Sequence, residues 1–169
     1  MTYLPLPLVI FLLIELIAVA WIDFKYRKIA NMWSILNLII FLLTFFLLEK
    51  GTFTIGHLYY PAIFFIVGFA FYTLRIMGGG DSKYLVSIYL LIPKIYHEGF
   101  LLSLLYVVVF IGITQFLYNS YVGRHLIFDF WKYRDTTYLK KCYGKKFPFA
   151  PLILLSWIIF FMNNLNTIR

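Results

Sequence analysis

Long apolar runs separated by short polar segments dominate this chain. A membrane-spanning helix needs about 20 mostly apolar residues, and a short one needs about 17. On that criterion we expect an all-α, polytopic membrane protein with about six transmembrane helices, the fourth of them visibly short. The six predicted helices are Tyr3–Ile22, Met32–Leu48, Leu58–Met77, Ser82–Ile92, Phe100–Tyr118 and Pro148–Met162.

The composition supports a membrane rather than a water-soluble protein. Hydrophobic residues make up 63% of the 169 positions and charged residues only 13%, whereas a soluble domain is nearer half apolar and a quarter charged. These values exclude a soluble enzyme, a disordered chain and a disulfide-rich secreted module. Cys142 is the single cysteine, which excludes an internal disulfide and a cysteine-based zinc site. The length fits one domain, residues 1–169.

The basic residues predict how the chain is oriented. Cytoplasmic loops of membrane proteins carry an excess of Lys and Arg. Alternate connections here hold 12 such residues on one side and 3 on the other, so we expect both termini on the non-cytoplasmic side. The 12 are Lys25, Arg27, Lys28, Arg75, Lys83, Arg124, Lys132, Arg134, Lys140, Lys141, Lys145 and Lys146, and the 3 are Lys50, Lys94 and Arg169.

The net charge of +8 raises two possible partners, nucleic acid and anionic lipid. No motif of a nucleic-acid-binding module surrounds the basic residues, so we expect membrane lipids and no nucleic acid. The one long connection, residues 119–147, mixes basic with aromatic residues. That mixture is typical of a segment lying in the headgroup layer, although a protein-binding role stays open.

Ionisable side chains at membrane depth are costly and are therefore the first candidates for function. Glu15, in the middle of the first predicted helix, could relay protons, but a protonated carboxyl hydrogen-bonded to a neighbouring helix explains it better. Asp23 follows that helix at its cytoplasmic end. There it could pair with Lys25 or Arg27, and the helix dipole opposes a negative charge.

Asp81 lies after three glycines, Gly78, Gly79 and Gly80, at the same predicted membrane face. Such a glycine run breaks a helix and lets another backbone come close, and irregular backbone at membrane depth is tolerated where it lines a cavity. We therefore expect a cavity with Asp81 at its wall. Asp81 is also placed to open the fourth helix, where the dipole favours an anion.

Two carboxyl groups in different electrostatic settings around one water are what an aspartic peptidase requires. The carboxylate takes a proton from the attacking water, and the acid donates to the developing oxyanion and later to the leaving amine. Because the pair would titrate as a unit, we assign the proton to neither Asp23 nor Asp81.

The motifs around these aspartates resemble those of the type IV prepilin peptidases. Residues 78–83 fit that family's GxGDxK signature, and residues 23–31 resemble its second catalytic motif, with Ala30 in place of a proline. The segment 147–151 is similar to its Pro-x-Gly-Pro, with Ala150 in place of glycine. Both aspartyl motifs occur in the family's order, so the resemblance covers nearly the whole chain.

The resemblance implies an aspartic endopeptidase of the cytoplasmic (inner) membrane that needs no cofactor. Its partner would be a prepilin-type precursor, cut after the glycine that ends a short basic leader, next to an apolar helix. The chain looks like the compact, single-function branch that serves Flp-type pili, because it lacks the paired cysteines of larger members that also methylate the product. This does not disprove methylation, and it leaves the oligomeric state open.

Other residues are candidates for supporting roles. Lys83 could hold Asp81 ionised or could be a cytoplasmic anchor, and Asn31 could act in the site or cap the second helix. We expect the substrate glycine to fit beside Gly78, Gly79 and Gly80. The three histidines, His57, His97 and His125, are dispersed over loops, so we expect no metal site.

Two other kinds of membrane protein also use intramembrane acids. A small transporter or channel subunit binds ions with acids at a broken helix, but here the two aspartates lie at one rim and no inverted repeat is visible. A presenilin-like protease shares the GxGD motif but needs a Tyr-Asp pair, and Ile22 precedes Asp23. Both alternatives are therefore less favoured than the prepilin peptidase.

Overall fold

The computed structural model describes residues 6–47, 55–74, 77–143 and 148–164. Within these ranges the regular structure is entirely helical, which confirms the predicted all-α class. The α-helices are α1 (Leu6–Tyr26), α2 (Asn31–Leu47), α3 (Tyr59–Thr73), α4 (Gly79–Leu91), α5 (His97–Val122), α6 (Arg124–Tyr133), α7 (Thr136–Tyr143) and α8 (Ala150–Asn163). Two short 3-10 helices, η1 (Ile55–His57) and η2 (Lys94–Tyr96), precede α3 and α5.

Each of the six apolar runs contains a helix, but several boundaries differ from the prediction. The fourth helix begins at Gly79 rather than Ser82, because glycine is tolerated in the first turn of a helix that another segment packs against. The fifth helix runs from His97 to Val122, past both predicted ends. The predicted boundaries Tyr3 and Leu48 lie outside the described residues, as do residues 75–76 and the basic residues Lys50, Arg75, Lys145, Lys146 and Arg169.

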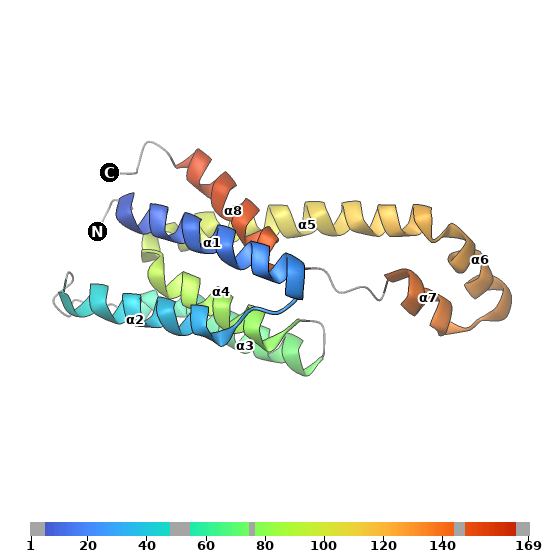
Figure 1. The fold of residues 1–169 in the computed structure, drawn as a ribbon, viewed down its shortest axis with the longest axis horizontal. Coiled ribbons are helices and arrows are strands. Elements are labelled where there is room, and N and C mark those ends of the chain that lie inside the picture. The colour runs from blue at the N-terminus through green and yellow to red at the C-terminus, as the bar shows by residue number, and fades with distance from the viewer. Residues whose placement is uncertain (1–5, 48–54, 75–76, 144–147, 165–169) are drawn as a thin grey trace.

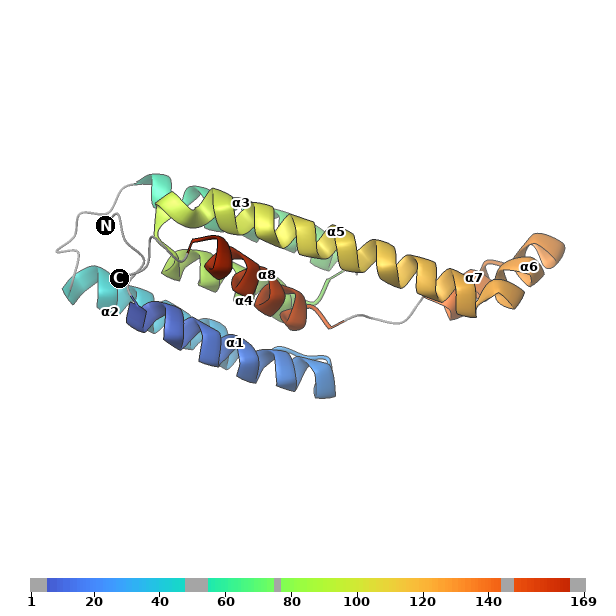
Figure 2. The same ribbon diagram turned by 90° about the horizontal axis from the view of Figure 1, so that it is seen from above.

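Helices α1 to α5 and α8 run alternately in opposite directions along one bundle (Figures 1 and 2). Helix α4 packs against α2 and α3, while α8 packs against α1 and α5. The alternation puts the end of α1 and the beginnings of α4 and α8 at the same end of the bundle. The beginning of α1 and the end of α8 lie together at the opposite end.

Aromatic side chains fill the centre of the bundle. Phe100 of α5 meets Trp157 and Phe160 of α8 at ring-centroid distances of 5.5 and 5.9 Å. All three rings are fully buried, as are Leu12 and Leu16 on α1. Edge-to-face contacts of this kind add to the energy of burying the rings, so they help to hold α5 and α8 together.

The sequence predicted a loop over residues 119–147, but the described part of this segment, residues 119–143, consists of the end of α5 followed by the helices α6 and α7. These two helices pack against each other and extend past the rest of the bundle (Figure 1). Helix α7 returns to the end of α5, where Tyr143 stacks on Phe116 and Cys142 donates its thiol hydrogen to the Asn119 carbonyl. Cys142 is a free cysteine.

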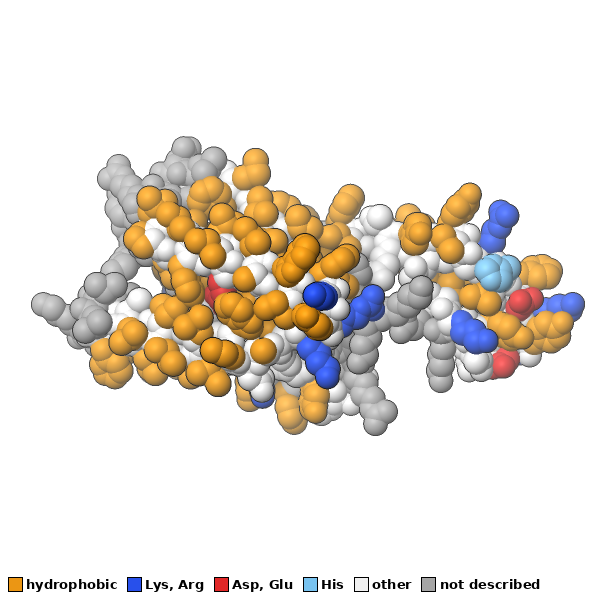
Figure 3. All heavy atoms as spheres, in the orientation of Figure 1, with side chains coloured by type: hydrophobic (Ala, Val, Ile, Leu, Met, Phe, Trp, Pro, Cys, Tyr) orange, Lys and Arg blue, Asp and Glu red, His pale blue; other side chains and the backbone are white. Residues whose placement is uncertain are grey.

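The face of the bundle seen in Figure 3 is largely apolar, and many large hydrophobic side chains of the described residues are exposed. Helix α1 and the segment Lys94–Val122 are long and apolar enough to cross a membrane, and α2, α3 and α8 contain shorter apolar helices. Lys and Arg side chains gather where α1 ends and over α6 and α7. An apolar belt with basic residues beyond one end is the distribution that a bilayer stabilises.

The packing predicts which tryptophan stabilises the fold. Trp157→Ala removes a fully buried ring, so we expect a loss of about 3–5 kcal/mol of unfolding free energy. Trp131→Ala on α6 is the matched control, because its ring is 78% exposed in the described structure. Thermal unfolding in detergent measures both, and equal shifts of Tm would contradict the assigned core.

Candidate active site

Asp23 lies in the last turn of α1 and is buried, with 3% of its surface exposed. Its Oδ2 accepts a hydrogen bond of 2.9 Å from the backbone N–H of Ala150, the first residue of α8. Its own carbonyl accepts a hydrogen bond from the N–H of Arg27, which ends the helix with a positive φ of 53°. Asp23 therefore joins the end of α1 to the beginning of α8.

This contact corrects the predicted electrostatic setting of Asp23. The sequence places Asp23 only at the C-terminal end of a helix, where the dipole opposes negative charge. The structure also puts its carboxyl at the N-terminal end of α8, where the unpaired backbone N–H groups favour negative charge. The predicted contrast between the two aspartates therefore stays a prediction, because Asp23 lies at the end of α1 and also contacts the first residue of α8.

Asp81 lies in the first turn of α4, as its third residue rather than at its opening as predicted. Its Oδ2 accepts a hydrogen bond of 3.1 Å from the backbone N–H of Gly78, the residue before that helix. The side chain is partly exposed, in contrast to Asp23. Asp81 is thus the more accessible of the two carboxyl groups.

Of the three glycines, Gly80 is the one at which the packing of α4 against the segment after α1 leaves no room for a side chain. A Cβ on this residue would lie 2.5 Å from the carbonyl oxygen of Ile29, in the segment that connects α1 to α2. Only glycine lets two backbones come this close. The expected cavity beside Gly80 is therefore wrong, because the chain's own backbone occupies that space, and the substrate glycine cannot fit there.

The other two glycines have different surroundings. A Cβ on Gly79 would lie 3.4 Å from the Tyr72 ring, which is close to ordinary contact. A Cβ on Gly78 would lie 2.9 Å from Asp81 Oδ2, so a side chain there would press on the candidate catalytic carboxyl. Gly78 is exposed and is thus the glycine beside Asp81 that a substrate could reach.

Lys83 and Asn31 are both exposed. Lys83 lies two residues after Asp81 on α4, and residues at that spacing do not share a helix face. Asn31 is the first residue of α2 rather than the residue before it, so it does not occupy the predicted capping position. The structure therefore leaves supporting roles for Lys83 and Asn31 as predictions.

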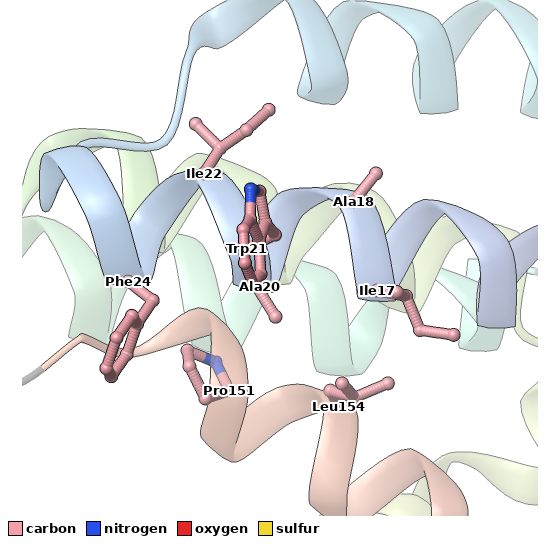
Figure 4. A pocket seen from close by; sticks show the side chains of 8 residues that line it. All are labelled: Ile17, Ala18, Ala20, Trp21, Ile22, Phe24, Pro151 and Leu154. Atoms are coloured by element: carbon pink, nitrogen blue, oxygen red, sulfur yellow. The ribbon is translucent and has the colours of Figure 1, made fainter.

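A groove of about 640 Å³ lies between α1 and α8, beside the residues that hold Asp23 (Figure 4). Ile22 and Phe24 flank Asp23 in the chain, and Pro151 follows Ala150. The lining side chains are hydrophobic, namely Ile17, Ala18, Ala20, Trp21, Ile22, Phe24, Pro151 and Leu154. The groove can hold an apolar chain segment against Ile22 and Phe24, the two residues that flank Asp23 in the chain.

Two of the three histidines lie next to each other, so the prediction that all three are dispersed is wrong. The rings of His57 and His97 contact each other with centroids 5.2 Å apart, and the His97 ring also meets Tyr60 and Tyr89. Their Nε2 atoms lie 2.9 and 2.8 Å from the carbonyls of Leu90 and Ile92. Among the described residues no three His, Cys, Asp or Glu side chains lie close enough to hold a metal ion.

Comparison with known proteins identifies the family. The model of the type IV leader peptidase family matches residues 10–117, which is 108 of the 169 residues. The chain belongs to this family. Its members are membrane-associated peptidases that act on prepilin-type substrates. Searches of curated proteins and of solved structures gave no match.

The matched range contains both aspartates but not α8. The hydrogen bond from Ala150 to Asp23 therefore joins a family motif to a helix outside the match. Sequence reasoning missed this partner because the donor is a backbone N–H, which carries no side-chain signal. The prolines at 148 and 151 were the available clue, since proline is frequent in the first turn of a helix.

The glycine contacts predict opposite effects of the same substitution at two positions. Gly80→Ala should destabilise the protein by about 1–3 kcal/mol, because the new Cβ displaces the Ile29 backbone. Gly112→Ala on α5 should be neutral or stabilising by about 0.5–1 kcal/mol, because a Cβ there meets nothing within 4 Å and alanine favours a helix. Thermal unfolding of both variants tests this, and a Gly80→Ala protein as stable as Gly112→Ala would contradict the contact.

Proposed function

We propose that this chain is a membrane aspartic endopeptidase that removes the leader of prepilin-type precursors, with Asp23 and Asp81 as its catalytic pair. One observation carries the proposal. The aspartates of the two prepilin-peptidase-like motifs each accept a hydrogen bond from a backbone N–H at the start of a helix, and both helices start at the same end of the bundle. Membership of the leader peptidase family supports the reaction class.

In this proposal residues 1–169 form one transmembrane domain with six crossings in the cytoplasmic membrane and both termini on the non-cytoplasmic side. The alternating directions of α1 to α5 and α8 support six crossings. The basic residues beyond the end of the bundle that carries the aspartates support a cytoplasmic location for that end.

The proposed reaction is a direct attack of water on the peptide carbonyl. One carboxylate of the pair accepts a proton from the water as its oxygen bonds to the carbonyl carbon, and the other carboxyl donates its proton to the developing oxyanion. Collapse of the tetrahedral intermediate breaks the C–N bond: the carboxyl that took the water's proton gives it to the leaving amine, and the other carboxylate takes a proton back from the intermediate's hydroxyl. The two carboxyls exchange roles in each turnover, so neither has a fixed protonation state.

The proposed substrate lies with its apolar helix in the groove between α1 and α8 and with its cleavage site at the aspartates. The hydrophobic lining, which includes the two neighbours of Asp23 in the chain, Ile22 and Phe24, supports this placement. The small glycine before the cut approaches Gly78, which is exposed next to Asp81. We propose that the basic residues of α6 and α7 contact anionic lipid headgroups. We propose no methyltransferase activity.

The pair of aspartates predicts a specific pattern of mutant activities. Asp23→Asn and Asp81→Asn should each abolish cleavage, because an amide can neither accept the water's proton nor exchange roles. The double variant should be no worse than either single variant, since residues that act as one unit are not additive. Cleavage of a co-expressed precursor measures this, and near wild-type processing by a normally expressed single variant would refute that aspartate's role.

The basic residues of the enzyme are not expected to bind the basic leader of the substrate. A basic leader gains no affinity from basic residues, so replacing Lys140, Lys141, Lys145 and Lys146 together by glutamine should leave cleavage largely intact. Enlarging the substrate glycine before the cut should nearly stop it. The cleaved fraction over time, in membranes with equal amounts of inserted protein, tests both changes. Strong loss from the lysine set, or tolerance of a bulky residue at the cut, would overturn this account of specificity.

A further inference from the structure

A cluster of buried polar side chains lies inside the bundle, away from the aspartates. Glu15 of α1, Asn37 of α2 and both Tyr84 and Ser87 of α4 are each at least 96% buried. The Glu15 carboxyl faces the side chains of Asn37 and Tyr84. Three helices that are separate in sequence thus bring their polar groups to one place in an apolar interior.

Some polar atoms of this cluster are hydrogen-bonded and others have no partner. Asn37 Nδ2 donates to Ser87 Oγ at 3.2 Å, and Ser87 Oγ donates to the carbonyl of Tyr84 at 2.7 Å. Both Glu15 carboxyl oxygens, Asn37 Oδ1 and the Tyr84 hydroxyl have no partner among the described residues. An unpaired buried polar group costs about 1–3 kcal/mol, so these groups are stable together only if they bond to one another.

Counting donors and acceptors shows which arrangement satisfies them. Asn37 Oδ1 can only accept a hydrogen bond, and the Tyr84 hydroxyl can donate one. A protonated Glu15 donates from one oxygen to Asn37 Oδ1 and accepts from Tyr84 with the other. With these two hydrogen bonds, both Glu15 oxygens, Asn37 Oδ1 and the Tyr84 hydroxyl each have a partner within the cluster.

We propose that Glu15, Asn37, Tyr84 and Ser87 form an interhelical hydrogen-bonded lock that fixes the register of α1 against α4 and so positions Asp23 relative to Asp81. Glu15 lies eight residues before Asp23 on the buried face of α1, and Tyr84 lies three residues after Asp81 on α4. A slip of either helix would move its aspartate by the same distance. Glu15 is then a positioning residue, and this role rests on the proposed peptidase function.

The test compares Glu15→Gln with Glu15→Leu. A glutamine amide donates to Asn37 Oδ1 and its carbonyl accepts from Tyr84, so Glu15→Gln should keep kcat within about twofold of wild type. Glu15→Leu should lower kcat about tenfold or more with little change in KM, because misplacing a catalytic group slows the chemical step more than binding. Ser156→Ala is the matched control, since Ser156 is also fully buried but, among the described residues, hydrogen-bonds only to Ile153 within its own helix.

A loss of activity in Glu15→Gln equal to that in Glu15→Leu would overturn the lock and indicate that Glu15 works through its charge, as in ion or proton transport. An unchanged kcat in Glu15→Leu would overturn the positioning role.

Thermal unfolding tests the lock without using activity. Glu15→Leu and Asn37→Leu remove members of the same network, so the Tm of the double variant should fall by less than the sum of the two single losses. Additive losses would overturn the cluster. A wild-type protein that cleaves no prepilin-type precursor would instead refute the proposed function, and these two failures are distinguishable.

Discussion

The approach of two backbones at Gly80 and Ile29 is the constraint on which the candidate site depends. Because Gly80 has no side chain, the first turn of α4 lies directly against the segment that leaves α1. Asp81 is the next residue along α4, and Asp23 lies six residues before Ile29. The hydrogen bond from Ala150 then fixes Asp23 from the other side, through α8. One close approach of two backbones, together with one hydrogen bond from a backbone N–H to the Asp23 carboxyl, thus gathers the two motifs at one end of the bundle.

This arrangement suits peptide hydrolysis at a membrane boundary. Asp23 is buried against a helix N-terminus, whereas Asp81 is partly exposed beside Gly78, so the pair combines one enclosed carboxyl with one that water and substrate can reach. The hydrophobic groove between α1 and α8 is lined along α1 by residues from Phe24 back to Ile17. Its apolar lining suits a substrate whose cleavage site is joined to an apolar helix. The polar cluster around Glu15 lies deeper, where it can set helix register without contacting the reaction.

The helices and the identities of the aspartates could be predicted from the sequence, but their surroundings could not. Apolar runs predict helices because, in a membrane, the backbone N–H and C=O groups of each run must hydrogen-bond to one another. Each of the six predicted helices accordingly corresponds to a helix in the structure. The contact between Ala150 and Asp23 joins residues 127 positions apart and uses a backbone donor, and a single sequence predicts neither feature. The helices of residues 124–143 were missed because their short amphipathic pattern is weaker than that of a span. Aromatic pairing of His57 with His97 likewise depends on how two distant turns meet.

The central claim is that Asp23 and Asp81 share one site, and a cross-link between them tests it most directly. The protein for this measurement carries Asp23→Cys and Asp81→Cys with Cys142→Ser, and is treated in membranes with a thiol-reactive linker long enough to bridge two side chains that share one water molecule. Asp23→Cys with Lys94→Cys is the control, because Lys94 precedes α5 at the opposite end of the bundle. Intact-mass analysis should find the bridged product for the first pair and only separately modified thiols for the second. If both thiols of the first pair react but no bridge forms, the two aspartates do not share a site.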